Sequence, residues 1–161
     1  ISKAHNQEEL VNGLKLAAEH DRKILVEEFI DGREVECAVL GTAEKAEAST
    51  IGEVLSAAEF YDYDAKYNNA ESKTVIPAEI DEEIINGVRK VALKVFKALD
   101  GSGLARIDFF VENGTNRIVF NELNTLPGFT AISMYPKLWE CAGKSIEELI
   151  DELISLACCG K

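Results

Sequence analysis

The chain contains little of what several classes of protein require. Its 161 residues include 17 lysines and arginines against 29 aspartates and glutamates, which gives a formal net charge of -12. An acidic surface of this kind repels a phosphate backbone, so we expect neither nucleic acid nor an anionic membrane as a partner. No apolar run approaches the length of a membrane span, and no charged-then-apolar leader opens the sequence. These absences predict a soluble, cytoplasmic protein.

Cysteine and glycine form none of the motifs for which they are known. The eleven glycines are scattered and make neither a P-loop nor a G-x-G-x-x-G pattern. The four cysteines have no spacing typical of a zinc site or a disulfide framework, and we expect reduced thiols at Cys37, Cys141, Cys158 and Cys159. Hydrophobic residues make up 47% of the chain, enough for the core of one domain.

The hydrophobic pattern predicts helices and strands without internal repeats. Capping boxes at Asn6 and at Ser145 open two of the helices. The expected helices cover residues 6–20, 79–99, 131–142 and 146–157. The expected strands cover residues 24–30 and 34–40, joined as a hairpin by Asp31-Gly32, and residues 49–54. Because strands and helices do not alternate as βαβ units, we expect an α+β domain with helices packed on one side of the sheet.

A second predicted hairpin concentrates polar residues. A turn-rich segment around Thr115 separates Arg106-Ile-Asp108 from Glu122-Leu-Asn124. If the two strands pair symmetrically about Thr115, Asp108 lies opposite Glu122 and Arg106 lies opposite Asn124. Strict alternation then places all four side chains on one face of the hairpin.

Two carboxylates side by side repel each other unless a cation lies between them. Magnesium that carries nucleotide phosphates fits, because it takes a few carboxylate oxygens and leaves its other positions to phosphate and water. Arg106 would then face a phosphoryl group in transfer. The alternative is an exposed hairpin face with ordinary salt bridges.

The segment Asn121-Glu-Leu-Asn-Thr-Leu-Pro-Gly-Phe-Thr130 closely resembles the ATP-grasp ligases, and within them the D-alanine:D-alanine ligases. The resemblance covers residues 24–40, 60–67, 103–108 and 121–138. It implies that residues 1–161 form the carboxy-terminal ATP-grasp catalytic domain, an antiparallel or mixed sheet backed by helices. It also implies that the chain begins where the family's amino-terminal domain and most of its central domain have already passed.

The resemblance assigns a nucleotide-binding role to the first predicted hairpin. Backbone groups of Phe29 and Ile30 would meet the adenine edge, and Glu27 would accept from its amino group. Glu34 would bind the ribose hydroxyls. An edge strand with solvated acids is the alternative for residues 26–30.

Residues 60–77 show no sustained period and predict a long loop. By resemblance, residues 57–78 form an active-site loop that closes over the reactants and excludes water. Lys66 would approach the phosphates in this loop, and Tyr67 would belong to the wall around the substrates.

The resemblance also assigns roles around the Pro-Gly bend. Two groups would stabilise the tetrahedral intermediate of the ligation, namely Arg106 and the backbone N–H of Gly128. Ser133 would bind the carboxylate of the second amino acid, and Met134 would line its side-chain pocket.

The implied reaction joins two D-alanines through an acyl-phosphate, to make D-Ala-D-Ala for peptidoglycan precursors. It requires ATP and two Mg²⁺ (or Mn²⁺) ions bound by Asp108, Glu122 and Asn124. The parent enzyme would be a homodimer, and residues 1–161 alone would be inactive. The alternatives are a D-Ala-D-Ser or other ATP-grasp carboxylate-amine ligase, and a non-catalytic nucleotide-binding module.

Overall fold

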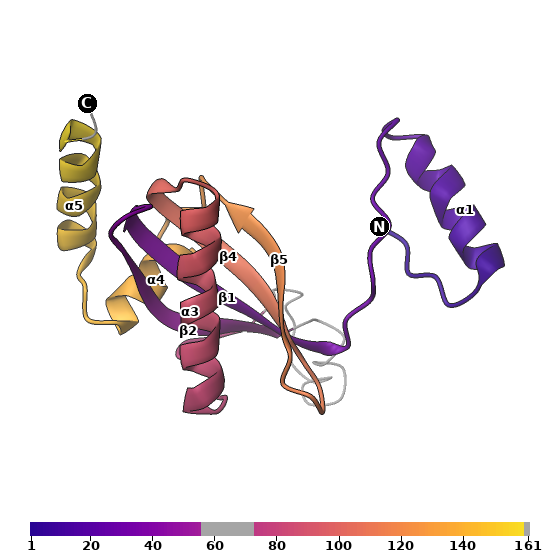
Figure 1. Ribbon diagram of the computed structural model, residues 1–161, viewed down its shortest axis with the longest axis horizontal. Coiled ribbons are helices and arrows are strands. Elements are labelled where there is room, and N and C mark those ends of the chain that lie inside the picture. Colours follow the sequence, from indigo (N-terminus) through magenta and orange to yellow (C-terminus); the bar gives the residue numbers. More distant parts are fainter. Residues whose placement is uncertain (56–72, 160–161) are drawn as a thin grey trace. The chain divides into compact units, whose positions relative to one another are not determined.

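A computed structural model gives the structure of the protein and describes residues 1–55 and 73–159. The chain divides into two compact units, Ile1–Asp31 and Gly32–Lys161, and each is described by itself. Unit 1 contains helix α1 (Gln7–Ala18; Figure 1). The Asn6 side chain accepts from the Glu9 backbone N–H at 3.0 Å, which confirms the predicted start of this helix.

The predicted hairpin of residues 24–40 is wrong. Residues 24–31 form no strand, and strand β1 begins at Gly32 and continues to Thr42. Gly32 lies within the sheet, opposite Glu112, where a Cβ would approach the Val111 carbonyl oxygen to 2.4 Å. The strand-forming residues before Asp31 are thus not part of the sheet that the structure describes, and propensity alone does not make a strand.

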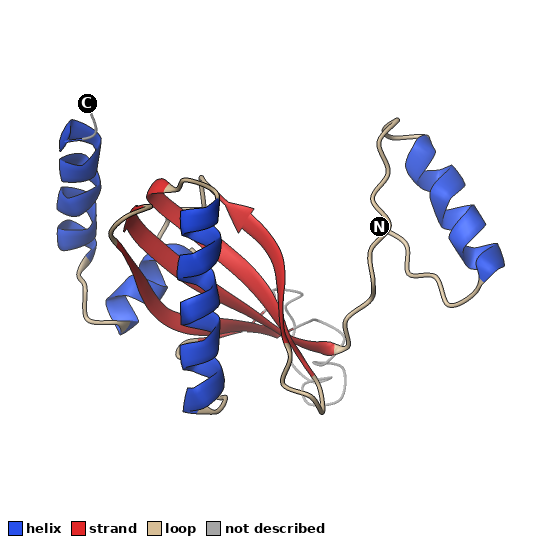
Figure 2. Ribbon diagram, viewed as in Figure 1, coloured by secondary structure: helices blue, strands red, loops and turns tan. Residues whose placement is uncertain are grey.

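Unit 2 is built on a five-stranded sheet in the order β3-β2-β1-β4-β5, with every neighbouring pair antiparallel (Figure 2). The other strands are β2 (Ala46–Leu55), β3 (Lys73–Val75), β4 (Ser102–Glu112) and β5 (Ile118–Asn124). The predicted α+β class and the predicted third strand are confirmed. Strand β3 occupies part of the expected loop of residues 60–77, because it pairs with the end of β2.

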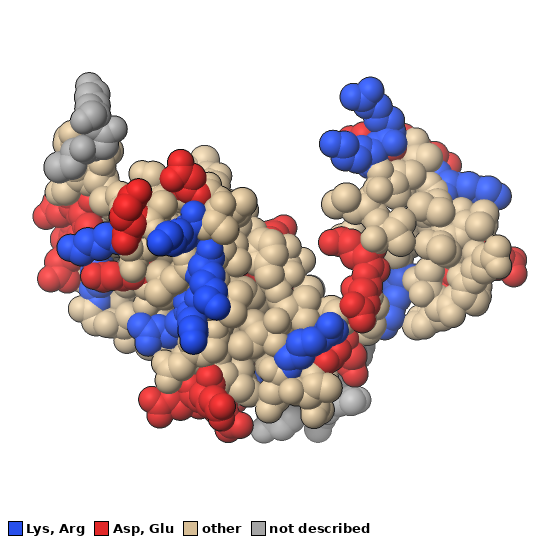
Figure 3. Space-filling model, viewed as in Figure 1, with Lys and Arg blue, Asp and Glu red and all other residues tan. Residues whose placement is uncertain are grey.

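Helix α3 (Glu82–Ala98) covers one face of the sheet. Its buried side chains are those of Val88, Ala92 and Phe96, and they pack on alternate residues of β1 and β4. Acidic side chains gather at the first turn of α3 and basic ones lie along the rest of it (Figure 3). This distribution complements the helix dipole.

Helices α4 (Met134–Cys141) and α5 (Ile146–Cys159) lie on the opposite face. The expectation that helices pack on one side is therefore wrong. The sheet is apolar on both faces near the end of β1, since Val39 packs under α3 while Ala38 and Leu40 join the cluster of α4 and α5. Each face requires its own cover.

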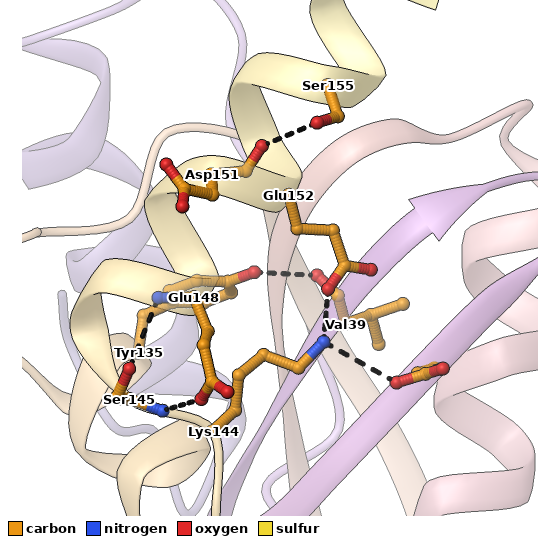
Figure 4. A network of polar contacts seen from close by, with 9 residues as sticks. Val39, Tyr135, Lys144, Ser145, Glu148, Asp151, Glu152 and Ser155 are labelled. Carbon is orange, nitrogen blue, oxygen red and sulfur yellow. Dashed lines mark hydrogen bonds and ion pairs between the residues drawn. The ribbon is translucent and has the colours of Figure 1, made fainter.

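Polar contacts anchor α5 (Figure 4). The Ser145 N–H donates to Glu148 at 2.8 Å and the Glu148 N–H donates back to the Ser145 hydroxyl at 3.2 Å, so the predicted capping box is confirmed. Lys144 forms an ion pair with Glu152, and the Tyr135 hydroxyl donates to the Val39 carbonyl at 3.0 Å.

The face that carries α4 and α5 changes character along the strands. Its apolar cluster includes Ala38 and Leu104. On the same face, Glu36 lies two residues before Ala38 in β1, and Arg106 lies two residues after Leu104 in β4. The polar part of this face carries the site described next. None of the helices in the described residues combines the length and the apolar character that a membrane span requires.

Candidate active site

The register of β4 and β5 brings the predicted polar residues together. Arg106 pairs with Asn124 and Asp108 pairs with Glu122, as the symmetric hairpin predicted. Nearer the turn the register shifts by one residue, because Phe109 pairs with Phe120 and leaves Asn121 as an extra residue in β5. The symmetry about Thr115 therefore ends at this bulge.

Arg106 and Asp108 form a bidentate ion pair. The distances are 2.9 Å from Arg106 Nε to Asp108 Oδ1 and 2.8 Å from the terminal nitrogen to Oδ2. Asp108 is only 3% exposed. This hydrogen bonding raises the pKa of the Arg106 guanidinium above its usual value, and the nearby Glu36 carboxylate adds to the effect.

Glu36 belongs to the same cluster, although the sequence pattern did not predict it. It lies opposite Asp108 in the β1–β4 ladder, with Oε2 at 3.1 Å from Arg106 Nε. The single hydrogen of Nε is donated to Asp108, and Glu36 Oε2 is buried without a hydrogen-bond partner. The alternation Glu34-Val-Glu36 was a usable signal, but only the pairing of β1 with β4 connects it to Arg106.

Burial and mutual repulsion shape the titration of these acids. Burial, followed by the charge of Asp108, raises the pKa of Glu36 to about 7. The same two causes, in the same order, raise the pKa of Glu34. Glu122 contributes repulsion at both positions. Four carboxylates thus lie within electrostatic range of one guanidinium, and the cluster carries surplus negative charge.

The donor set fits a hard divalent cation. Carboxylate oxygens are the ligands that Mg²⁺ prefers, and the unpartnered Oε2 of Glu36 shows that the cluster has oxygen atoms left unsatisfied. Among the described residues, no three carboxylate, imidazole or thiol side chains converge as a preformed metal cage. A cation here would take its remaining ligands from water or phosphate, as magnesium bound to a nucleotide does.

The Pro-Gly bend after β5 is held by side chains. The Ser133 hydroxyl accepts from the Thr130 N–H at 3.0 Å, and the Asn124 side chain accepts from the Leu126 N–H at 3.0 Å. A Cβ at Gly128 would lie 2.8 Å from Ser133 Oγ, so glycine permits this close approach. The bend and the hairpin face are therefore fixed to each other through consecutive residues.

Met134 is 7% exposed and belongs to the apolar cluster of α4 and α5. A Cβ at Gly52 would lie 2.8 Å from its sulfur, so the side chain packs directly on strand β2. Its assignment to a substrate pocket stays a prediction.

The predicted adenine contacts are divided between the two units. Glu27, Phe29 and Ile30 belong to unit 1, whereas Glu34 belongs to β1 of unit 2. Phe29 is 63% exposed, and the Lys3 ammonium lies 3.4 Å from the centre of its ring. Lys66 and Tyr67 lie outside the described residues. These nucleotide and loop assignments stay predictions.

Comparison with known proteins decides the family. Residues 1–155 match the model of the D-Ala-D-Ala ligase C-terminus. The chain belongs to the D-alanine–D-alanine ligase family. It is 57% identical over 157 residues to the D-alanine–D-alanine ligase of Acetivibrio thermocellus and 55% identical over 157 residues to that of Clostridium acetobutylicum. The alignments cover 98% of this chain but only 42% and 46% of those ligases.

Solved ligase structures share the fold. The D-alanine–D-alanine ligase of Coxiella burnetii superposes with a TM-score of 0.80 at 36% identity, covering 96% of this chain and 40% of that one. The D-Ala:D-Ser ligase VanG of Enterococcus faecalis gives 0.81 at 40% identity, covering 94% and 43%. The Bacillus anthracis D-alanine–D-alanine ligase complexed with ATP gives 0.77 at 32% identity, covering 96% and 49%.

Proposed function

We propose that this chain is the carboxy-terminal catalytic part of an enzyme that ligates two D-alanines with ATP. One observation carries the proposal: in a chain of this family, Asp108 and Glu122 lie directly opposite each other beside Arg106. The product would be D-Ala-D-Ala for peptidoglycan precursors. Because the relatives are about twice as long as this chain, the rest of the enzyme supplies the remaining part of the nucleotide cleft.

Asp108, Glu122 and Asn124 would bind two Mg²⁺ (or Mn²⁺) ions, which offset phosphate charge when bound. Arg106 then faces the reacting phosphoryl group. Together with the Gly128 N–H it stabilises the charge that develops as the second amine attacks the acyl-phosphate.

The other contacts follow from the family resemblance. Glu27 and the backbone of Phe29 and Ile30 bind adenine, and Glu34 binds the ribose. Lys66 and Tyr67, in the active-site loop of residues 57–78, close over the reactants. The parent enzyme is a cytoplasmic homodimer, and residues 1–161 alone do not ligate.

Ser133 would bind the carboxylate of the second amino acid, and Met134 would form the apolar wall of its pocket. A D-Ala-D-Ser ligase is the second candidate, because the VanG structure is 40% identical to this chain. The apolar side chain of Met134 favours D-alanine, since a pocket selective for serine needs a hydrogen-bonding group at its hydroxyl.

The proposal is tested with Asp108→Asn and Glu122→Gln in the complete enzyme. Each change removes one anionic ligand and conserves shape, so D-Ala-D-Ala formation should fall by about a hundredfold or more. Glu112→Gln is the matched control, because Glu112 sits at the turn of the same hairpin, paired with Arg117. If both site variants keep the activity of the control across magnesium concentrations, the hairpin face is a solvated surface and the proposal fails.

A further inference from the structure

Two buried glutamates of this sheet differ in how their charge is satisfied. Glu53 is 5% exposed, and both of its carboxylate oxygens accept from Arg33, at 2.6 and 2.5 Å. Glu36 is 7% exposed, yet its Oε2 has no hydrogen bond although Arg106 Nε lies 3.1 Å away. A buried carboxylate oxygen without a hydrogen bond costs free energy, so its presence calls for a function.

Asp108 and Glu36 both lie beside Arg106 Nε, and this arrangement points to a function for Glu36. In the structure, Asp108 takes the Nε hydrogen and a hydrogen of a terminal nitrogen. Under the proposed function Asp108 is also a magnesium ligand, and a divalent cation on its oxygens weakens their attraction for the guanidinium. Arg106 then needs a second acceptor to stay in place.

We propose that Glu36 is a positioning residue that accepts the Nε hydrogen of Arg106 when the metal engages Asp108. This inference rests on the proposed function and adds a residue to it. Glu36 and Asp108 are neighbours across the β1–β4 ladder, so the guanidinium passes from one carboxylate to the other by a small rotation. The guanidinium therefore stays fixed beside the phosphoryl group throughout the reaction.

The first test observes the Nε–H resonance of Arg106 in the ¹⁵N-labelled complete enzyme, assigned by its loss in Arg106→Lys. Without metal, wild type and Glu36→Gln should both show a protected resonance, because Asp108 holds the hydrogen. With magnesium and a non-hydrolysable ATP analogue, wild type should keep this protection, whereas Glu36→Gln should exchange the hydrogen faster, because an amide oxygen is a weaker acceptor than a carboxylate. A resonance that stays equally protected in both enzymes overturns the inference.

The second test is kinetic coupling. Glu36→Gln should lower kcat by about tenfold, and the loss should disappear in an Arg106→Lys background, because the glutamate acts through that side chain. Glu53→Gln is the matched control, since it breaks a buried Arg–Glu pair on the opposite face. Any effect of Glu53→Gln should be independent of Arg106. A loss from Glu36→Gln that is equally large in the Arg106→Lys background indicates a merely structural role.

The outcomes separate this inference from the proposed function. If wild type forms D-Ala-D-Ala and Glu36→Gln has the same kcat and the same Arg106 Nε–H resonance, only the role of Glu36 is overturned. Wild type that forms no D-Ala-D-Ala overturns the proposed function. In that case, the Nε–H resonance still decides whether the Arg106 hydrogen bond moves from Asp108 to Glu36 when the metal binds.

Discussion

The cluster around Arg106 shows what a single sequence predicts at the scale of residues. The pairing of Asp108 with Glu122 was predictable, because a turn and strict alternation lie within twenty residues of chain. Glu36 was not, because its position beside Asp108 depends on β1 and β4 pairing across more than sixty residues. A local pattern therefore located the carboxylates of the hairpin but not the carboxylate beneath Arg106.

Glu36 makes the stability of the metal-free chain depend on pH. Its pKa is raised from 4.5 to about 7, chiefly by burial, so the folded state retains a proton that the unfolded state releases. The stabilisation is complete below about pH 4.5 and is lost as the pH rises through 7. We expect wild type to lose on the order of 2 kcal/mol relative to Glu36→Gln between pH 5 and pH 8.

Urea unfolding in EDTA at both pH values measures this difference. A free energy of unfolding that changes equally in wild type and in Glu36→Gln would show that Glu36 titrates normally in the folded protein.

At the scale of elements, periodicity and capping predicted the helices well and propensity predicted one hairpin wrongly. The helix expected over residues 79–99 is observed as α3, since its apolar residues recur at helical spacing over many turns. The hairpin predicted over residues 24–40 is wrong, because Asp31-Gly32 indicates a turn only where the strands on both sides of it pair with each other. Gly32 instead lies inside the ladder of β1 and β4.

The capping box of α5 gives a prediction for an element. Ser145→Ala removes the hydroxyl that accepts from the Glu148 N–H, and should lower the free energy of unfolding by about 1 kcal/mol. Ser155→Ala is the control, because Ser155 donates to the Asp151 carbonyl within the same helix and adds no cap. Chemical denaturation of both variants measures the difference. Equal losses would show that the box does not stabilise α5.

At the scale of the molecule, the proposal that this chain supplies part of a cleft has a direct consequence for residues 1–161 alone. Magnesium-ATP would form only part of its contacts but lose the same translational and rotational freedom. We expect affinity on the order of millimolar or weaker, and no detectable D-Ala-D-Ala. Calorimetric titration and a product assay measure both. Micromolar binding or turnover by this chain alone would contradict the division of the site.

The bulge in β5 determines which side of the sheet receives the chemistry. Phe120 packs edge-on against Phe109, which is buried under α3, with ring centres 6.1 Å apart, while Glu122 lies beside Asp108 on the other face. Residues two apart in a regular strand share a face, and the extra Asn121 is what separates them. The location of Glu122 beside Asp108 thus depends on the ladder passing over Asn121. If the strand ran regularly through Asn121, that residue would lie opposite Asp108, and Glu122 would lie opposite Ile107 in the apolar layer under α3. Deleting Asn121 should instead leave Glu122 opposite Asp108, because the residue removed is the extra one of the bulge.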